Sequence, residues 1–152
     1  MKKKRCLLLC IFTIFILLSL VIVFFQYRHY YKVGDMVFTF WKTGNGCYIM
    51  PYKYWKLTIP KTNFMLASNV GGVVIYIGED STLYVFPSYT YKRGAQTIEI
   101  NLTSYKYEYY PYINEIDSKF ASNDKMKHYK NNGYPFIDIY FGEMNAEIGN
   151  IR

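Results

Sequence analysis

Few side chains in this 152-residue chain have the types and spacing that catalysis requires. Cys47, His128 and Asp138 are a nucleophile, a base and an acid, but no local motif unites them. Asp138 stands between two isoleucines, which is the pattern of a strand with one polar face. His29 and His128 are too far apart in the sequence to form a recognisable metal motif. The sequence therefore predicts no catalytic residue, no metal site and no cofactor.

Tyrosine is the residue type that stands out, with 18 copies in the chain. Its rigid ring and hydroxyl suit protein-binding surfaces, although half-buried strands also favour it. Tyrosines recur at alternate positions after residue 104, which predicts an aromatic stripe on one face of a strand. We expect this stripe to be an outward protein-binding surface, and its residues are Tyr105, Tyr107, Tyr109, Tyr110 and Tyr112. If the stripe belongs to the core instead, replacing it should unfold the domain.

The longest apolar run, residues 6–25, holds no charged residue and only two hydroxyl side chains, Thr13 and Ser19. As a helix rising about 1.5 Å per residue, it would cover roughly the 30 Å hydrocarbon core of a bilayer. A helix also satisfies its own backbone hydrogen bonds in lipid. The run therefore predicts a transmembrane helix.

The flanks of this run predict its orientation. Lys2, Lys3, Lys4 and Arg5 precede it, whereas Arg28 and Lys32 are the nearest basic residues after it. An excess of Lys and Arg marks the cytoplasmic side, so the remainder of the chain should be extracytoplasmic, most simply outside a bacterial inner membrane. A cleaved signal peptide is the alternative, but the apolar run is long and bulky residues follow Ser19 where a peptidase needs small ones. We therefore expect a retained single-pass signal-anchor.

Charge and cysteine content exclude other classes. Of the 18 basic residues, six lie in residues 1–32 without any acidic residue, and the remaining 12 are balanced by 11 acidic residues. A nearly neutral domain is a poor ligand for nucleic acid, so the expected partners are the lipid bilayer and another protein. Cys6 and Cys10 read as apolar helix residues, with acylation as the alternative, and Cys47 as a small buried side chain.

The chain divides into five predicted regions. Residues 1–5 form a basic cytoplasmic tail, and residues 6–25 form the transmembrane helix. The tyrosine-rich residues 26–32 should form a collar at the membrane interface. Residues 33–142 are long enough for one domain with its own core, and residues 143–152 read as a tail.

Strand patterns dominate the predicted domain. Residues 36–41 and 47–50 flank Gly44-Asn45-Gly46, which predicts a hairpin. Residues 52–59, between prolines, should form an edge strand. Residues 73–77 show no alternation, which predicts a central strand buried on both faces. Residues 82–86 should pair with this strand across a short turn.

The second half of the domain contains a change of phase. Apolar residues occupy even positions in residues 97–102 and odd positions in residues 105–109, so a turn or bulge must lie near Thr103 and Ser104. The apolar residues within 113–129 then have helical spacing, which predicts a helix that ends at Gly133. Residues 135–141 should form the last strand. The predicted fold is mainly β, with α+β as the alternative: a small antiparallel sheet or barrel-like domain with one short helix, after the transmembrane helix.

Two classes of function fit these expectations. The first is a membrane-anchored extracytoplasmic binding module of the cell envelope, such as an immunity-type inhibitor or a small subunit of an envelope complex. The second is a membrane-anchored enzyme that acts on glycans or lipids. The tyrosine content and the lack of catalytic motifs favour the binding module.

Overall fold

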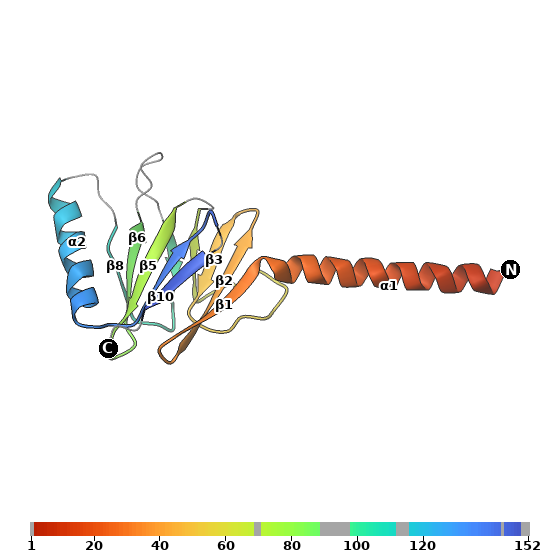
Figure 1. Cartoon of the computed structure of the whole chain (residues 1–152), viewed down its shortest axis with the longest axis horizontal. Helices are drawn as coiled ribbons and strands as arrows, with labels where there is room; N and C mark the ends of the chain where they lie inside the picture. The colour runs from red at the N-terminus through yellow and green to blue at the C-terminus, as the bar shows by residue number, and fades with distance from the viewer. Residues whose placement is uncertain (1, 69–70, 89–97, 112–115, 144, 150–152) are drawn as a thin grey trace.

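Two helices and ten strands make up the part of the chain that the computed structural model describes, namely residues 2–68, 71–88, 98–111, 116–143 and 145–149. They are α1 (Lys2–Gln26), β1 (Arg28–Val33), β2 (Met36–Thr43), β3 (Gly46–Met50), β4 (Phe64–Ala67), β5 (Gly72–Ile77), β6 (Leu83–Ser88), β7 (Ile98–Asn101), β8 (Tyr107–Tyr109), α2 (Ile116–Asn131), β9 (Phe136–Tyr140) and β10 (Asn145–Gly149). The strands and α2 form the folded domain, and α1 extends away from it (Figure 1). The expectation of a mainly β fold is confirmed.

The strands form two five-stranded sheets rather than one. Sheet A has the order β1-β2-β3-β4-β7, and sheet B has the order β10-β9-β5-β6-β8. All neighbouring strands are antiparallel except β6 and β8, which are parallel. Side chains from both sheets meet in one apolar core, which includes Phe38 and Phe40 of sheet A and Ile75, Ile137 and Ile139 of sheet B.

A second layer covers the outer face of each sheet. Residues 51–63 lie against sheet A, where Tyr54 packs with Trp41, Tyr48 and Phe64. Helix α2 contributes Met126 and Tyr129 to an aromatic cluster on the outer face of sheet B. Strands β3 and β5 are therefore buried along their whole length, which explains why their sequences do not alternate.

The predicted hairpins and central strand are confirmed. Strands β2 and β3 pair around Gly44-Asn45, and β5 and β6 pair around residues 78–82. Strand β5 lies in the middle of sheet B. Gly46 has a φ of 141°, and a Cβ atom there would stand 2.4 Å from the carbonyl oxygen of Ala67, so this position needs glycine to let β4 approach.

The predicted phase change marks the crossing between the sheets. Strand β7 pairs with β4 in sheet A, and β8 pairs with β6 in sheet B. Residues 102–106 connect these strands without regular structure. The turn near Thr103 and Ser104 is therefore confirmed, and it moves the chain from one layer to the other.

The end of α2 is also as predicted. Gly133 has a φ of 71°, and its N–H donates to the Lys130 carbonyl at 3.2 Å. The N–H of Tyr134 donates to the Tyr129 carbonyl at 3.2 Å, and the two tyrosine rings contact each other. This pair of bonds is a Schellman motif, which needs a left-handed residue after the helix. The first predicted helical residues, 113–115, lie outside the described part of the chain.

The edge strand predicted at residues 52–59 is wrong. These residues form an irregular loop whose backbone groups bond to distant side chains. The Thr39 hydroxyl donates to the Tyr52 carbonyl at 2.6 Å and accepts the Tyr54 N–H at 2.8 Å. Because side chains satisfy the backbone groups of the loop, it needs no neighbouring strand.

Two predicted boundaries of the domain also differ. Of residues 26–32, expected to form a collar outside the domain, residues 28–32 belong to β1, which pairs with β2 at the edge of sheet A. Residues 145–149, expected in a tail, form β10 and pair with β9 at the edge of sheet B. In both cases the strand depends on a neighbour rather than on its own apolar pattern.

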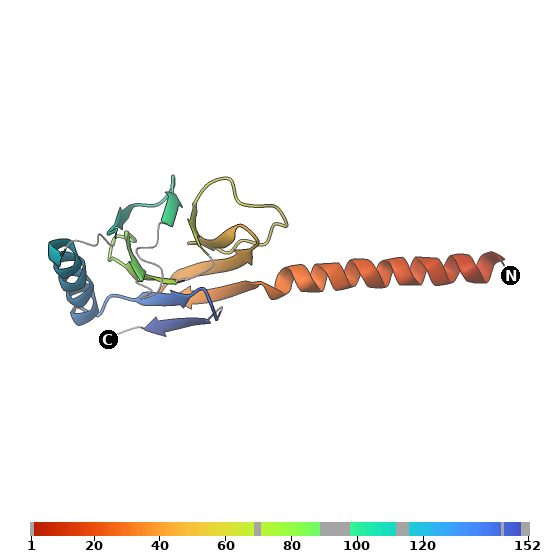
Figure 2. The ribbon, with the colours of Figure 1, turned by 90° about the horizontal axis from the view of Figure 1, so that it is seen from above.

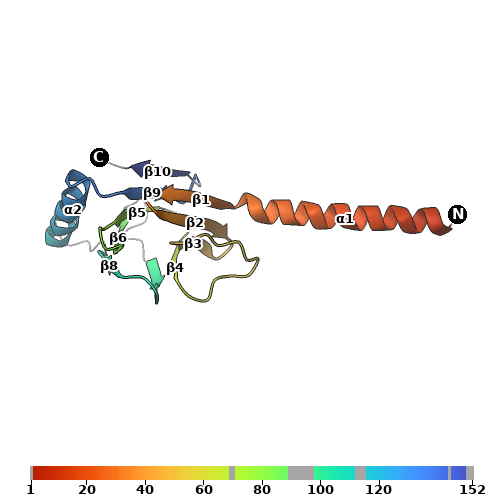
Figure 3. The same cartoon turned by 90° about the horizontal axis from the view of Figure 1, so that it is seen from below.

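Helix α1 spans Lys2–Gln26 and points away from both sheets (Figures 2 and 3). The helix expected over residues 6–25 is therefore present. Thr13 and Ser19 donate to the carbonyls of Leu9 and Phe15, each at 2.8 Å, one turn earlier. Within the described residues, no helix has both the length and the apolar character of a membrane span.

Candidate functional site

The outer face of sheet B carries an aromatic cluster that positions α2. Tyr129 of α2 stacks on Tyr84 with a centroid distance of 4.2 Å and lies 5.8 Å from the ring of Tyr76. On the other side, Tyr110 stacks on Phe86 at 4.7 Å. Burial raises the pKa of Tyr129, so its hydroxyl stays neutral in the cluster. The cluster fixes one side of α2 and leaves the other side to form a groove.

A groove of about 470 Å³ lies between α2 and strands β5, β9 and β10. Its floor is apolar, and one wall carries two lysines while the other carries two carboxylates. The lining residues are Val74, Tyr76, Asn123, Met126, Lys127, Lys130, Phe136, Asp138 and Glu147. In all three views of the chain α2 lies at the end of the domain farthest from α1 (Figures 1, 2 and 3).

Asp138 lies in this groove with one carboxylate oxygen bonded and the other buried without a partner among the described residues. Its Oδ2 accepts a hydrogen bond from the Tyr140 hydroxyl at 3.0 Å. Its Oδ1 is buried and has no hydrogen-bond partner among the described residues. Burial raises the pKa of Asp138, and the carboxylate of Glu147 raises it further. Glu147 is the residue opposite Asp138 in the register of β9 and β10.

The expectation that Asp138 lies on a solvent face is therefore only half right. Ile137, Ile139 and Phe141 do point into the core, and Asp138 points the other way. However, that face is covered by α2, so Asp138 is half-buried in the groove. The sequence signal for this was the helix expected directly before the strand, which predicts a covered face.

The five tyrosines expected to form one stripe are in different surroundings. Tyr105 and Tyr109 are half-buried against the core between the sheets, and burial raises the pKa of both. Tyr107 is exposed, whereas Tyr110 belongs to the aromatic cluster under α2. Tyr112 lies outside the described residues. A single outward stripe of Tyr105, Tyr107 and Tyr109 is therefore wrong, while a role in binding stays a prediction.

The possible nucleophile, base and acid do not meet. Cys47 is buried in the core between the sheets, where burial raises its thiol pKa to about 11. Asp138 is on the opposite face of sheet B, and His128 is exposed on α2 beside Asn132. No group of three metal-ligating side chains occurs within the described ranges. The expectation that Cys47 is a small buried residue is confirmed.

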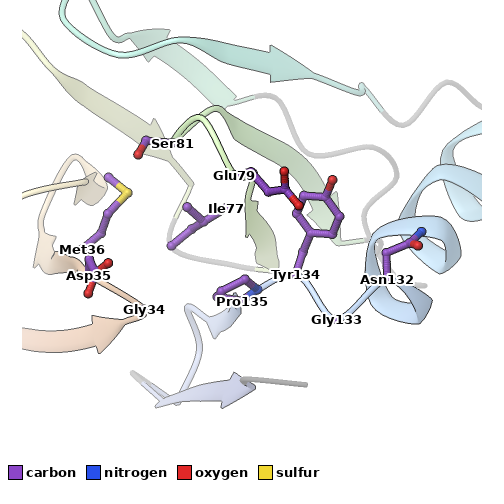
Figure 4. Close-up of a pocket in the computed structure, with 11 residues that line it drawn as sticks. Gly34, Asp35, Met36, Ile77, Glu79, Ser81, Asn132, Gly133, Tyr134 and Pro135 are labelled. Carbon is purple, nitrogen blue, oxygen red and sulfur yellow. The ribbon is translucent and has the colours of Figure 1, made fainter. Parts of the chain in front are cut away.

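A second cavity of about 260 Å³ lies where three turns meet (Figure 4). Its residues come from the β1–β2 turn, the β5–β6 turn and the connection from α2 to β9. The acidic groups in it, Asp35 and Glu79, are both exposed. Among the described residues that line it, no histidine, cysteine, lysine or arginine is present to act with them. The groove beside α2 is therefore the stronger candidate site.

The shape and lining of the groove are suited to binding. An apolar floor with charged walls can hold a side chain and direct its polar groups. Comparison with known proteins adds no relative, since no family model, no curated protein and no solved structure matches the chain.

Proposed function

We propose that this protein is a single-pass membrane-anchored binding module whose folded domain lies outside the cytoplasm. The proposal rests on the exposure of the apolar side chains of α1. Its large apolar side chains between Leu8 and Ile22 are exposed, from a helix that extends away from the domain. Such a surface is costly in water and favourable in a bilayer. The four basic residues before the run support an N-terminus on the cytoplasmic side.

The groove beside α2 is the proposed binding site for another protein. Its position at the far end of the domain from α1 would leave it open to a partner approaching the membrane. Tyr76, Met126 and Phe136 provide apolar contact. The exposed charged groups of Lys127, Lys130 and Glu147 can pair with polar groups of the bound segment. An immunity-type inhibitor or a small envelope-complex subunit would work in this way.

Membrane extraction tests the anchor. The full chain, produced in bacteria, should stay in the pellet after an alkaline wash. Replacing Ile14 and Leu17 by lysine should release it, because each charge near the bilayer centre costs about 3 kcal/mol. The control exchanges the same positions for leucine and isoleucine and should behave as the wild type. Release of the wild-type protein by the wash would contradict the anchor.

Site-specific crosslinking tests the groove. A photoreactive residue in place of Lys127, on the wall of the groove, should give a defined protein adduct in cells. The same residue in place of the exposed Glu99, on β7 of sheet A, should not. Replacing Asp138 by alanine should weaken the adduct at position 127. Equal adducts at both positions would contradict a binding role for the groove.

A second candidate function is favoured by the two carboxylates in the groove. Asp138 and Glu147 face each other across β9 and β10, and Asp138 has a raised pKa. Glycan hydrolases use such a pair, with one carboxyl protonated as the general acid. A membrane-anchored glycan hydrolase should release reducing ends from envelope glycan and lose this activity in Asp138→Asn. Absence of activity in the wild type would eliminate this candidate.

A further inference from the structure

The loop of residues 51–63 displays large apolar side chains to solvent. Trp55, Leu57 and Ile59 are 69%, 58% and 47% exposed, although they lie within five consecutive positions. Exposed lysines are interleaved with them or flank them, at Lys53, Lys56 and Lys61. A concentrated apolar patch on a small domain marks an interaction surface, and its mixture with lysine indicates an anionic partner.

The loop is held in place by the first residues after α1. The Arg28 guanidinium donates to the carbonyls of Tyr54 at 3.3 Å and Lys56 at 3.0 Å. It also lies 4.1 Å from the ring centroid of Trp41, beneath the loop. The Tyr30 hydroxyl donates to the same Tyr54 carbonyl at 3.0 Å. The path of the loop is therefore tied directly to the point where the chain leaves α1.

Bonds within the loop complete this support. The Tyr54 hydroxyl donates to the Thr58 carbonyl at 2.6 Å, and Tyr54 itself is buried against sheet A. The side chains on either side of this anchor, Trp55 and Lys53, point outward and are exposed. The apolar side chains are thus presented by a supported loop.

The position of the loop relative to α1 indicates what it meets. In all three views the loop lies at the end of the domain from which α1 leaves (Figures 1, 2 and 3). Along the long axis of the molecule, the loop extends past the C-terminal end of α1 in the direction of the N-terminus. Exposed Tyr27 and Tyr30 lie at the same end. A bilayer that contains α1 would have its surface at this level. Tryptophan and tyrosine favour that interface, and lysine favours anionic headgroups.

We propose that residues 51–63 form a lipid-contacting loop that seats the domain on the membrane in which α1 is anchored. Trp55, Leu57 and Ile59 enter the interfacial layer, while Lys53, Lys56 and Lys61 contact anionic headgroups. This inference rests on the proposed anchor but goes beyond it, because an anchored domain could also stand clear of the lipid. Seating fixes the orientation of the domain and directs the groove beside α2 away from the bilayer.

Fluorescence quenching by brominated lipid tests the loop. The full chain is reconstituted in phosphatidylcholine–phosphatidylglycerol vesicles whose lipids carry bromine near the headgroup end of the acyl chains. The protein has two tryptophans, and Trp41 is only 4% exposed. Brominated lipid should therefore quench a large part of the wild-type emission, and the quenched part should come from Trp55 alone. In the matched variant Trp55→Phe, the remaining Trp41 emission should be the same in brominated and plain lipid.

Flotation of the same vesicles separates the two proposals. Protein that floats with the vesicles but shows no quenching, or equal fractional quenching in the wild type and Trp55→Phe, would overturn the loop proposal and leave the anchor intact. This would also be the result if the apolar patch served another protein. Protein that does not float would overturn the anchor and the loop together. Replacing Lys53, Lys56 and Lys61 by glutamine should reduce the quenching of Trp55 without preventing flotation.

Discussion

At the scale of single residues, Asp138 contributes to the pH dependence of the stability of the domain. Its pKa is raised in the folded state by burial, so the folded protein holds this proton more tightly than the unfolded chain does. The associated stability is present below the unfolded pKa and is lost as the pH rises through the folded pKa. Ionised Asp138 therefore lowers the stability of the folded protein at neutral pH.

We therefore expect Asp138→Asn to raise the melting temperature at pH 7 relative to the wild type. The amide can still accept the Tyr140 hydroxyl, but it has no charge to desolvate. The gain should shrink as the pH falls through the folded pKa of Asp138 toward its lower unfolded pKa, because the folded wild type then takes up the proton. Thermal melts of the full chain in detergent across this range measure it, with Glu79→Gln as the exposed control. A gain independent of pH would contradict this account.

Two glycines of the first hairpin form a matched pair for a second prediction. Gly46→Ala forces a Cβ atom to within 2.4 Å of the Ala67 carbonyl oxygen and should cost about 2 kcal/mol of stability. At Gly44 no atom lies within 4 Å of an added Cβ atom, so Gly44→Ala should change stability by less than about 0.5 kcal/mol. Denaturant titration of both variants measures the difference, and equal effects would contradict the close approach of β4.

Tyr107 and Tyr109 separate core from surface on one short strand. Tyr109→Ser removes a ring that packs on the core and should cost about 2 kcal/mol. Tyr107 is 41% exposed, so Tyr107→Ser should leave the melting temperature nearly unchanged. If Tyr107 contributes to a binding surface, its replacement should weaken partner capture at full stability. A loss of stability in Tyr107→Ser equal to that in Tyr109→Ser would contradict the observed surroundings.

At the scale of elements, the attachment of α2 depends on Tyr129. Its ring contacts Tyr76, Tyr84 and Phe86 of sheet B. Tyr129→Ala should cost about 3 kcal/mol and speed hydrogen exchange of the amides in α2, because the helix loses these ring contacts with the sheet. Asp124→Ala, at an exposed position of the same helix, should not. Unchanged exchange in α2 of Tyr129→Ala would contradict this role.

Elements whose local pattern is decisive could be predicted from the sequence. The uninterrupted apolar residues of β5, the phase change after β7 and the glycine at the end of α2 each have a direct structural cause. The Asp138 groove could be predicted only in part, since it needs the seating of α2 on sheet B. The pattern of apolar residues does not predict that α2 packs on sheet B with a groove of this size beside it.

Elements that depend on distant residues could not be predicted in this way. Strand β1 is rich in tyrosine, which suits a membrane interface and a strand equally. Strand β10 has only two apolar residues, Ala146 and Ile148, which are too few to predict a strand, and it depends on its pairing with β9. The loop of residues 51–63 is shaped by Arg28 and Thr39, which are remote in sequence. The sequence of residues 52–59 contains no pattern from which those hydrogen bonds could be predicted.

At the scale of the whole molecule, the two proposed contacts lie at opposite ends of the protein. One end holds α1 and the loop of residues 51–63, and the other holds α2 and the groove. In the proposed function, this arrangement gives a module held to a membrane with its binding site facing outward. It requires the domain to lie on the side opposite the basic N-terminus.

The location of the C-terminus tests this claim most directly. A bacterial alkaline phosphatase fused to Arg152 folds into an active enzyme only outside the cytoplasm, so we expect high phosphatase activity in intact cells. Moving the four basic residues of positions 2–5 to positions after Phe25 should reduce this activity, because the charge bias sets the topology. An inactive phosphatase fusion, together with a fluorescent cytoplasmic reporter at the same position, would contradict the account.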